Sequence, residues 1–341
     1  MVQTFLRRAL PAAAALTLVA GCSGTSLTPG QSAAVSPNAY HAPAGMRVLP
    51  GPAVAGPIVV PLVPRKPNAP AGWPDPRKRH HHHKEFLFVA DASSGVLIYN
   101  PKTANGSPIG SLTNGVSTPA GLAVDNSGSL YVANLGNNTV TVYPKGSSSP
   151  SLTISSGIDG PYGITVDSNG NVWVSNLNTN NITAYAAGQT SPYATINFNA
   201  YGQAVGLGVD ASDNIWVACD TSNGVFEIPA GTTNVQNSGL TSLNGPISVS
   251  FGKSDIIYVS DFGGSNVEVY NYGSTTPSET ITTGIEKNGP TLGGFTAADA
   301  YFQSNQSDNV VGYKPGQTSP FSTLSGASSP LGIASSPLVR K

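Results

Sequence analysis

The side chains with the clearest potential for chemistry are carboxylates and amides that recur about every 43 residues. Each closes a short apolar segment such as Tyr-Val-Ala-Asn or Trp-Val-Ser-Asn. The six residues are Asp91, Asn134, Asn176, Asp220, Asp261 and Asn305. If the segments are equivalent strands, these side chains share one rim, and their oxygens are ligands that Ca²⁺ accepts. The alternative is that each residue caps a turn of its own repeat and holds no metal.

Histidine and cysteine offer less. The run His80, His81, His82 and His83 can bind Zn²⁺, Ni²⁺ or Cu²⁺, or it can simply extend the basic tract 77–84. Residues 85–341 contain no histidine, and no nucleophile with a neighbouring base stands out. The two cysteines, Cys22 and Cys219, have unrelated contexts, so neither a disulfide framework nor a metal spacing is expected. Cys219 lies in an apolar segment and is expected to be buried.

Irregular loops are the best guide to a ligand-binding surface, because a repeat does not require them. They are 135–138, 200–205, 262–265 and 284–294. If both loop classes gather on one face, a small set of side chains would line a common surface. The candidates are Leu135, Tyr162, Tyr201, Gln203, Phe262 and Lys287.

The elements that must position these residues follow from the repeat. A Pro-x-Gly segment precedes the carboxylate or amide in 119–125 and 161–167, and weaker copies begin at Gly206, Pro246 and Pro290. An apolar alternation follows, which ends at Tyr99, Tyr143, Tyr185, Tyr270 or Tyr313 and at Ile228 in the fourth repeat. A short Ser/Thr-rich segment completes the unit. Four strands at this period predict an all-β fold, a six-bladed β-propeller of four-stranded blades. The first repeat lacks its Pro-x-Gly strand and 330–334 supplies a copy, so the C-terminal strand is expected to close the first blade.

The N-terminal quarter of the chain, residues 1–84, is predicted to contain a targeting signal and a spacer. Arg7 and Arg8 precede an apolar run that ends in Val-Ala-Gly-Cys22, which resembles the bacterial lipobox. We therefore expect residues 1–22 to be a lipoprotein signal peptide, cleaved before Cys22, which is acylated. Residues 23–84 are rich in proline and basic, which predicts a disordered tether without strands, including the apolar stretch 57–63. The domain expected to fold is 85–341.

Charge is divided unevenly along the chain. The net charge is −1, but residues 23–84 carry seven basic and one acidic side chain, and residues 85–341 carry seven basic and sixteen acidic ones. An acidic body argues against nucleic-acid binding. The basic tether can contact an anionic membrane surface.

Residues 85–341 resemble six-bladed propellers of NHL repeats, a superfamily that includes virginiamycin B lyase-like and gluconolactonase-like (SMP-30-like) rings. The resemblance rests on Pro-x-Gly-[Leu/Ile]-x-Val-Asp, then [Tyr/Trp]-Val-[Ala/Ser]-Asn, then an alternation ending in Tyr. The lyases of this group need a catalytic histidine and related zinc rings need histidine ligands, which residues 85–341 lack. The gluconolactonase-like rings place a divalent ion at the channel mouth on Glu, Asn and Asp. The resemblance implies fold more than function.

The resulting expectation is a monomeric, non-catalytic binding module, displayed from the cell envelope on a lipid-anchored tether. Its partner would be a protein, a glycan or peptidoglycan, and Ser23 after Cys22 favours the outer membrane or cell surface. A metal-dependent hydrolase of lactonase type that uses the acidic and amide rim is the alternative. A metal-scavenging role for His80–His83 is a third interpretation.

Overall fold

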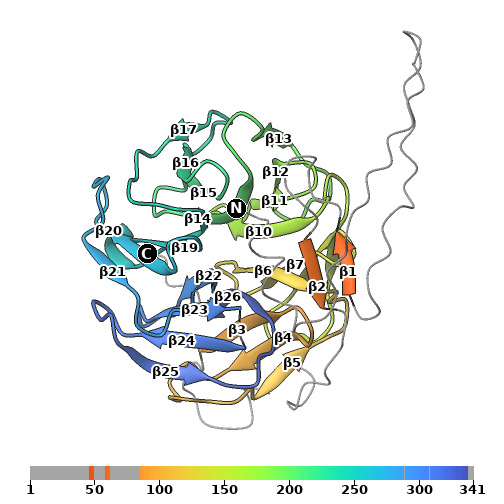
Figure 1. Cartoon of the computed structure of the whole chain (residues 1–341). Helices are drawn as coiled ribbons and strands as arrows, with labels where there is room; N and C mark the ends of the chain where they lie inside the picture. The colour runs from red at the N-terminus through yellow and green to blue at the C-terminus, as the bar shows by residue number, and fades with distance from the viewer. Residues whose placement is uncertain (1–45, 50–57, 62–84, 288, 307, 337–341) are drawn as a thin grey trace, which may run out of the picture.

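The computed structural model describes residues 46–49, 58–61, 85–287, 289–306 and 308–336. Residues 85–336 form six sheets of four antiparallel strands, arranged as blades around a central axis (Figure 1). The six-bladed propeller predicted from the repeat is confirmed. In five blades the chain runs from the inner strand to the outer strand in order.

Each blade contains four strands, which follow one another from the axis outward. Blade 1 consists of β26 (Pro330–Ser336), β3 (Phe86–Asp91), β4 (Gly95–Tyr99) and β5 (Gly110–Leu112). Blade 2 consists of β6 (Pro119–Val124), β7 (Leu130–Asn134), β8 (Thr139–Tyr143) and β9 (Leu152–Ile154). Blade 3 consists of β10 (Pro161–Val166), β11 (Val172–Asn176), β12 (Asn181–Tyr185) and β13 (Ala194–Asn197).

The other half of the ring repeats this arrangement. Blade 4 consists of β14 (Ala204–Val209), β15 (Ile215–Cys219), β16 (Gly224–Ile228) and β17 (Gln236–Asn237). Blade 5 consists of β18 (Pro246–Phe251), β19 (Ile257–Asp261), β20 (Asn266–Tyr270) and β21 (Glu279–Ile281), with the 3-10 turn η2 (Lys253–Asp255) between its first two strands. Blade 6 consists of β22 (Pro290–Phe295), β23 (Tyr301–Asn305), β24 (Asn309–Tyr313) and β25 (Pro320–Leu324).

The two ends of the propeller domain meet in blade 1. Strand β26 pairs antiparallel with β3, with Ile333 opposite Val89 and Ser336 opposite Phe86. The prediction that the C-terminal strand closes the first blade is therefore confirmed. Closure gives blade 1 the same four strands as the other blades and leaves β3 paired on both sides.

The glycine of the Pro-x-Gly motif is explained by packing at the axis. A Cβ atom on Gly121 would lie 2.2 Å from the carbonyl oxygen of Tyr162 in the next blade, and one on Gly332 would lie 2.2 Å from that of Ala120. A Cβ atom on Gly163 would likewise lie 2.4 Å from the carbonyl oxygen of Val205. Only a residue without a side chain allows the inner strands to approach so closely. The strand register also shifts within this motif, as between Pro119 and Leu122.

The tyrosines that end the third strands fasten neighbouring blades. Tyr143, Tyr185 and Tyr270 are fully buried. Their hydroxyls donate to loop carbonyls just before the same blade, from Tyr143 to Asn114 at 2.5 Å, for example, and from Tyr185 to Ser156 at 2.7 Å. Each ring thus fills the interblade core while its hydroxyl remains hydrogen-bonded, as buried tyrosines require.

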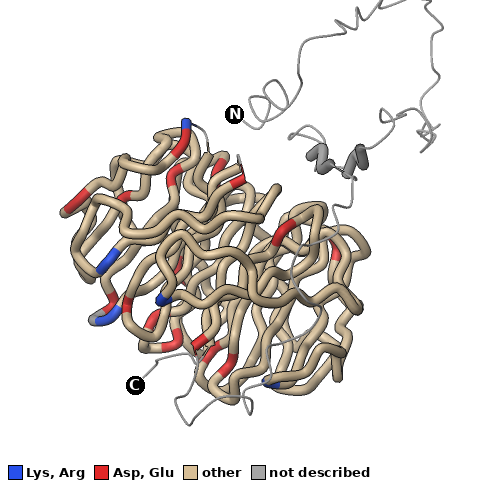
Figure 2. Tube along the Cα trace, turned by 90° about the horizontal axis from the view of Figure 1, so that it is seen from below, with Lys and Arg blue, Asp and Glu red and all other residues tan. Residues whose placement is uncertain are grey.

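The loops divide between two faces. We call the face that bears the turns after the second strands and the loops after the fourth strands the mouth face, and the opposite one the turn face. On the turn face, Asp167 and Asp210 accept backbone hydrogen bonds in the first hairpin turns, and the carboxylates also accept from Trp173 and Trp216. Figure 2 shows that acidic positions outnumber basic ones along the propeller.

One part of the tether departs from its prediction. Strands β1 (Met46–Leu49) and β2 (Ile58–Pro61) pair antiparallel, with Val48 opposite Val59. The expectation that residues 57–63 contain no strand is therefore wrong. Apolar β-branched residues pair here although prolines flank them. No helix in the described ranges has the length and apolarity to cross a membrane.

Candidate functional site

Two asparagine side chains of the predicted polar ring form hydrogen bonds within their own blades. Asn134 accepts a hydrogen bond from the Ser117 amide at 3.0 Å and donates to the Thr141 hydroxyl at 3.0 Å. Asn176 accepts from the Asp159 amide at 3.0 Å and donates to Thr183 at 3.0 Å. Each side chain therefore ties the loop before the first strand to the third strand of the same blade.

The ring position of blade 4 needs a correction. Cys219 pairs with Gly224 across the hairpin and with Ala204 on the inner strand, as Asn134 pairs with Thr139 and Pro119. Cys219, not Asp220, therefore occupies the ring position of this blade. It is fully buried and free, as expected for an apolar strand, and burial raises the pKa of its thiol. Asp220 lies one residue further on.

Most ring oxygens are engaged in the fold, although Asn305 Oδ1 is buried without a hydrogen-bond partner. Asp91 accepts from Ser93 and Ser94 in its own turn and from Ser328 and Ser329 across the closure. Asp261 accepts from the Asn244 amide with both oxygens, at 2.9 and 2.8 Å. Among the described residues, no group of three or more His, Cys, Asp or Glu side chains is placed to hold a metal ion. These contacts favour the structural role of the ring over Ca²⁺ ligation.

Asp261 is the ring member whose charge fits its surroundings least. It is buried, and burial raises its pKa to about 6, with the nearby charge of Glu268 adding to the shift. Beside it, Asn266 Oδ1 is buried without a hydrogen-bond partner. In blade 3 the equivalent oxygen, Asn181 Oδ1, accepts a hydrogen bond from the side-chain amide of Asn176 at 3.0 Å.

We therefore expect Asp261→Asn to stabilise the propeller. The asparagine keeps one oxygen for the Asn244 amide and supplies an N–H to Asn266 Oδ1, although it loses the contact from Gly264. The free energy of unfolding should rise by about 1 kcal/mol, measured by denaturant titration at pH 7.5.

The effect of this variant should depend on pH. Because the pKa of Asp261 is raised in the folded protein, the native protein binds the extra proton between pH 4 and 6, and wild-type stability falls as pH rises through this window. The advantage of the variant should shrink below pH 6. A variant less stable than wild type at pH 7.5 would contradict this assignment.

The residue after each ring position points to a second feature. In five blades it is Ala92, Leu135, Leu177, Phe262 or Gln306, and the middle residue of each Pro-x-Gly or equivalent segment lies beside it. The apolar ones among these side chains form two clusters around the axis at the mouth face. We call them the mouth collar, and they are Ala92, Ala120, Leu135, Tyr162, Leu177, Val205, Ile247, Phe262 and Leu331.

Asp220 is the acidic member of this circle. Its position corresponds to that of Leu135 and Phe262, and it is half-buried. Burial raises its pKa to about 6, against the lowering effect of the Thr221 amide. Tyr162 joins both apolar clusters and is itself half-buried. Burial and the charge of Asp220 raise the pKa of its hydroxyl, so the two polar groups share one environment.

The structure separates the residues predicted to line a common surface. Leu135, Tyr162 and Phe262 belong to the mouth collar. Gln203 lies under it, where its side-chain amide donates to the Leu177 carbonyl at 3.1 Å. Tyr201 packs instead in the interblade core, with ring centroids 5.4 Å from Phe198.

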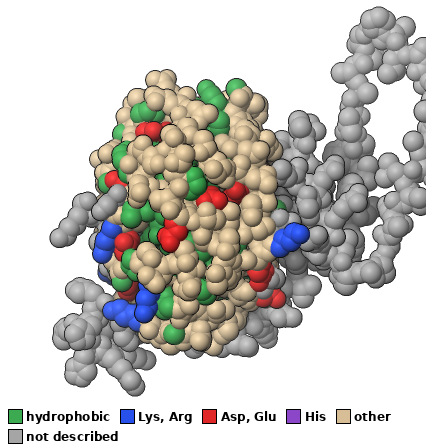
Figure 3. All heavy atoms as spheres, turned by 60° about the vertical axis from the view of Figure 1, so that its left-hand side comes forward, with side chains coloured by type: hydrophobic (Ala, Val, Ile, Leu, Met, Phe, Trp, Pro, Cys, Tyr) green, Lys and Arg blue, Asp and Glu red, His purple; other side chains and the backbone are tan. Residues whose placement is uncertain are grey.

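The remaining candidates lie in an exposed loop of the mouth face or outside the described residues. Lys287 is exposed in the loop between β21 and β22. Cys22 and His80–His83 lie outside the residues that the structure describes. The side of the propeller seen in Figure 3 carries hydrophobic side chains scattered among polar ones.

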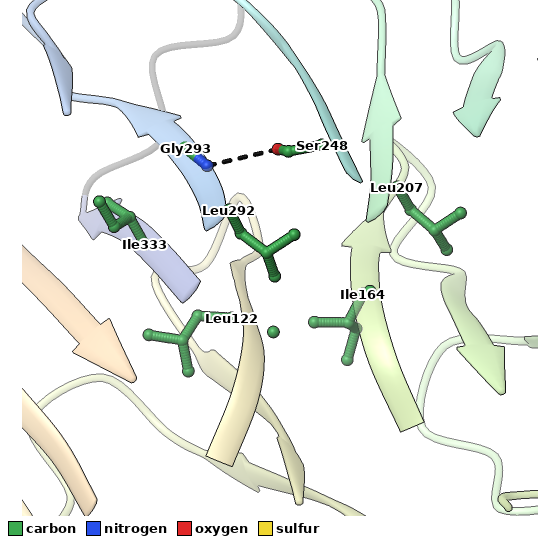
Figure 4. Close-up of a pocket in the computed structure, with 9 residues that line it drawn as sticks. Leu122, Ile164, Leu207, Ser248, Leu292, Gly293 and Ile333 are labelled. Atoms are coloured by element: carbon green, nitrogen blue, oxygen red, sulfur yellow. Dashed lines mark hydrogen bonds between the residues drawn. The ribbon is translucent and has the colours of Figure 1, made fainter. Parts of the chain in front are cut away.

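The channel below the mouth is nearly filled. A cavity of about 30 Å³ on the axis is lined by Leu122, Ile164, Leu207, Leu292 and Ile333, with Ser248 and the inner-strand glycines (Figure 4). Ser248 accepts a hydrogen bond from the Gly293 amide at 3.3 Å, and this is the dashed line in Figure 4. Such a volume holds about two water molecules. A larger ligand does not fit this cavity.

Sequence reasoning named three members of the mouth collar, Leu135, Tyr162 and Phe262, but not the others or the special place of Asp220. A signal was present, because aligning Trp216 with Trp173 places Cys219 opposite Asn176. Matching the segments by their terminal polar residue hid the shift by one position. With Cys219 in the ring, the spacing between ring positions becomes 43, 42, 43, 42 and 44 residues.

Comparison with known proteins supports the fold. The NHL repeat model matches residues 117–143, which include β6, β7 and β8. No curated protein matches the sequence. A structure described as a nidogen/laminin complex is similar, with a TM-score of 0.59, 14% identity, and coverage of 74% of this chain and 98% of that chain. A streptogramin B lyase structure has a TM-score of 0.51 and 14% identity, and the match covers 78% of this chain and 86% of that one. Identities this low show the fold alone.

Proposed function

We propose that this six-bladed β-propeller, which contains an NHL repeat, is a non-catalytic binding module, displayed from the bacterial cell envelope on a lipid-anchored tether. The observation that carries the proposal is the mouth collar, two apolar clusters joined by Tyr162, with Asp220 and Gln306 at the corresponding places of blades 4 and 6. Apolar surface with few placed polar groups is typical of binding sites. The similar propeller of the nidogen/laminin complex belongs to a protein assembly, which agrees with such a use of the fold.

The alternative of a metal-dependent lactonase has less support. It requires free ring oxygens, whereas those of Asn134, Asn176 and Asp91 accept hydrogen bonds from backbone amides. Residues 85–341 also contain no histidine to serve as a general base. Lactone turnover by the purified protein that requires Ca²⁺ would reverse this preference.

The mouth face is tested by photo-crosslinking in intact cells. A photoreactive residue at Gln306, which is exposed beside the mouth collar, is expected to give a discrete crosslinked product. The same residue at Lys145, which is exposed on the turn face, is the matched control and should give none. Products from both faces alike, or from Lys145 alone, would refute the mouth face as the binding surface.

The anchor is tested separately through Cys22. Acyl chains contribute about 0.8 kcal/mol of membrane affinity per buried CH₂, so two or more chains hold a protein stably. We expect Cys22→Ala to block processing and to move the protein from the membrane fraction to the soluble fraction, as seen by cell fractionation and by labelling with a radioactive fatty acid. Cys219→Ala is the control, because that thiol is buried in β15. Unchanged membrane association of the Cys22 variant would rule out the lipid anchor.

A further inference from the structure

Asp220 breaks the pattern of its own repeat. At the corresponding place the neighbouring blades 3 and 5 have Leu177 and Phe262, which are 5% and 6% exposed. A carboxylate among apolar side chains loses hydration, and this loss lowers the free energy of unfolding. A residue of this kind calls for an explanation by structure or by binding.

Structure does not supply the explanation. In blades 2, 3 and 5 the ring residue accepts the backbone amide that precedes the first strand, namely that of Ser117, Asp159 and Asn244. In blade 4 the ring residue is Cys219, and the Gln203 amide, one residue before β14, donates to the Thr221 hydroxyl at 2.8 Å. Thr221 therefore ties the loop before β14 to the turn after β15, and Asp220 has no part in this contact. Asp220 Oδ1 is left buried without a hydrogen-bond partner.

The surroundings define the ligand. Tyr162 packs in one cluster with Val205 and Ile247, and Val205 follows Ala204, which pairs with Cys219 next to Asp220. An aromatic ring with a hydroxyl and aliphatic surface therefore lie in the same part of the mouth as the carboxylate. One carboxylate is too little for Ca²⁺, which takes about six to eight oxygen ligands. An organic cation on an alkyl stem suits all of these groups, since the charge pairs with Asp220, the ring of Tyr162 attracts the cation, and the stem covers apolar surface.

We infer that Asp220 and Tyr162 form an anchor site at the mouth face for a lysine or arginine side chain of a protein partner. This inference rests on the proposed binding role of the mouth face. It identifies the group that the partner inserts and the residue that recognises it. Ligand binding then satisfies a carboxylate oxygen that is unpaired in the free protein. Arginine in particular is frequent among the residues that dominate interface energies.

The test uses n-butylammonium and n-butylguanidinium, which reproduce the ends of lysine and arginine. Their binding to the full chain in detergent is measured by saturation-transfer NMR. Both are expected to bind with dissociation constants in the millimolar range, and n-butanol is expected to bind at least about tenfold more weakly. Asp220→Asn should weaken the cations at least about tenfold, as expected when a charge-assisted contact is lost. Tyr162→Leu should weaken them by a smaller factor.

Two controls make the test decisive. Asp159→Asn removes the same charge from a loop of the mouth face and should bind the cations as wild type does. Asp220→Asn should melt no lower than wild type, because it relieves a buried charge, so a loss of binding cannot be ascribed to unfolding. Equal binding by Asp220→Asn and wild type, or displacement of the cations by millimolar Ca²⁺, would overturn the inference. Crosslinking from Gln306 without cation binding would reject the anchor alone, whereas absence of mouth-face crosslinks would reject the proposed function.

Discussion

Deletion of residues 329–341 is expected to lower the melting temperature of the propeller by roughly 10–20 °C. Strand β26 forms the inner edge of blade 1 and pairs with β3 over Phe86–Asp91. About five backbone hydrogen bonds of about 1 kcal/mol each are lost, and each kcal/mol corresponds to about 2–4 °C in a domain of this size. The fully buried side chains of Leu87 and Phe88 also lose their cover. Differential scanning calorimetry measures the effect.

The loss extends beyond blade 1. Thr291 in blade 6 donates to the Leu331 carbonyl at 3.1 Å, and Ser335 donates to the Phe295 carbonyl at 2.7 Å. Both contacts disappear with β26. A truncation after Ser336, which keeps every pair of this strand, is the matched control and should melt as the intact chain does. A chain lacking 329–341 that melts with that control would show that ring closure contributes little to stability.

The repeat predicted the blades because each strand of a propeller has the same neighbours in every unit. Tyr143 and Tyr185 recur at the same place because both fill an interblade core and reach a loop carbonyl. Gly121 and Gly163 recur because the inner strands approach too closely for a side chain. Periodicity therefore carries information wherever a contact is repeated around the axis.

The site was less predictable because it depends on departures from the repeat. Tyr201 and Phe262 both occupy irregular loops, yet Phe262 joins the mouth collar and Tyr201 packs on Phe198 and Phe226. Only alignment by strand separates the two, because Phe262 follows its ring position as Leu135 does, whereas Tyr201 lies three residues before its first strand as Ile158 does. The mouth collar itself unites residues from distant parts of the chain, and only the closed ring brings them together. That Thr221, and not Asp220, holds the loop before β14 appears only when hydrogen bonds are assigned.

The same ring position demands a carboxylate in one blade and favours an amide in another. Asn134 fits because its N–H groups face acceptors such as the Thr141 hydroxyl. Asp261 stands beside an unpartnered acceptor, which is why asparagine is expected to stabilise that blade. Asp91 has different surroundings, since two backbone amides donate to each of its oxygens, whereas one Asn244 amide is shared by the two oxygens of Asp261. Chemical identity at this position thus follows the donors and acceptors around it.

Asp91→Asn is therefore expected to destabilise the propeller strongly. One oxygen accepts from Ser93 and Ser94, the latter at 2.8 Å, and the other accepts from Ser328 at 2.6 Å and Ser329 at 2.9 Å. In either orientation the asparagine turns an NH₂ group towards two backbone amides. Losing two hydrogen bonds to a charged acceptor, at about 1.5–3 kcal/mol each, lowers the free energy of unfolding by about 3–6 kcal/mol. Denaturant titration beside Asp261→Asn gives the sharpest comparison, because the same chemical change should shift stability in opposite directions. If both variants shift it in the same direction, the ring residues do not act through the local hydrogen bonds assigned to them.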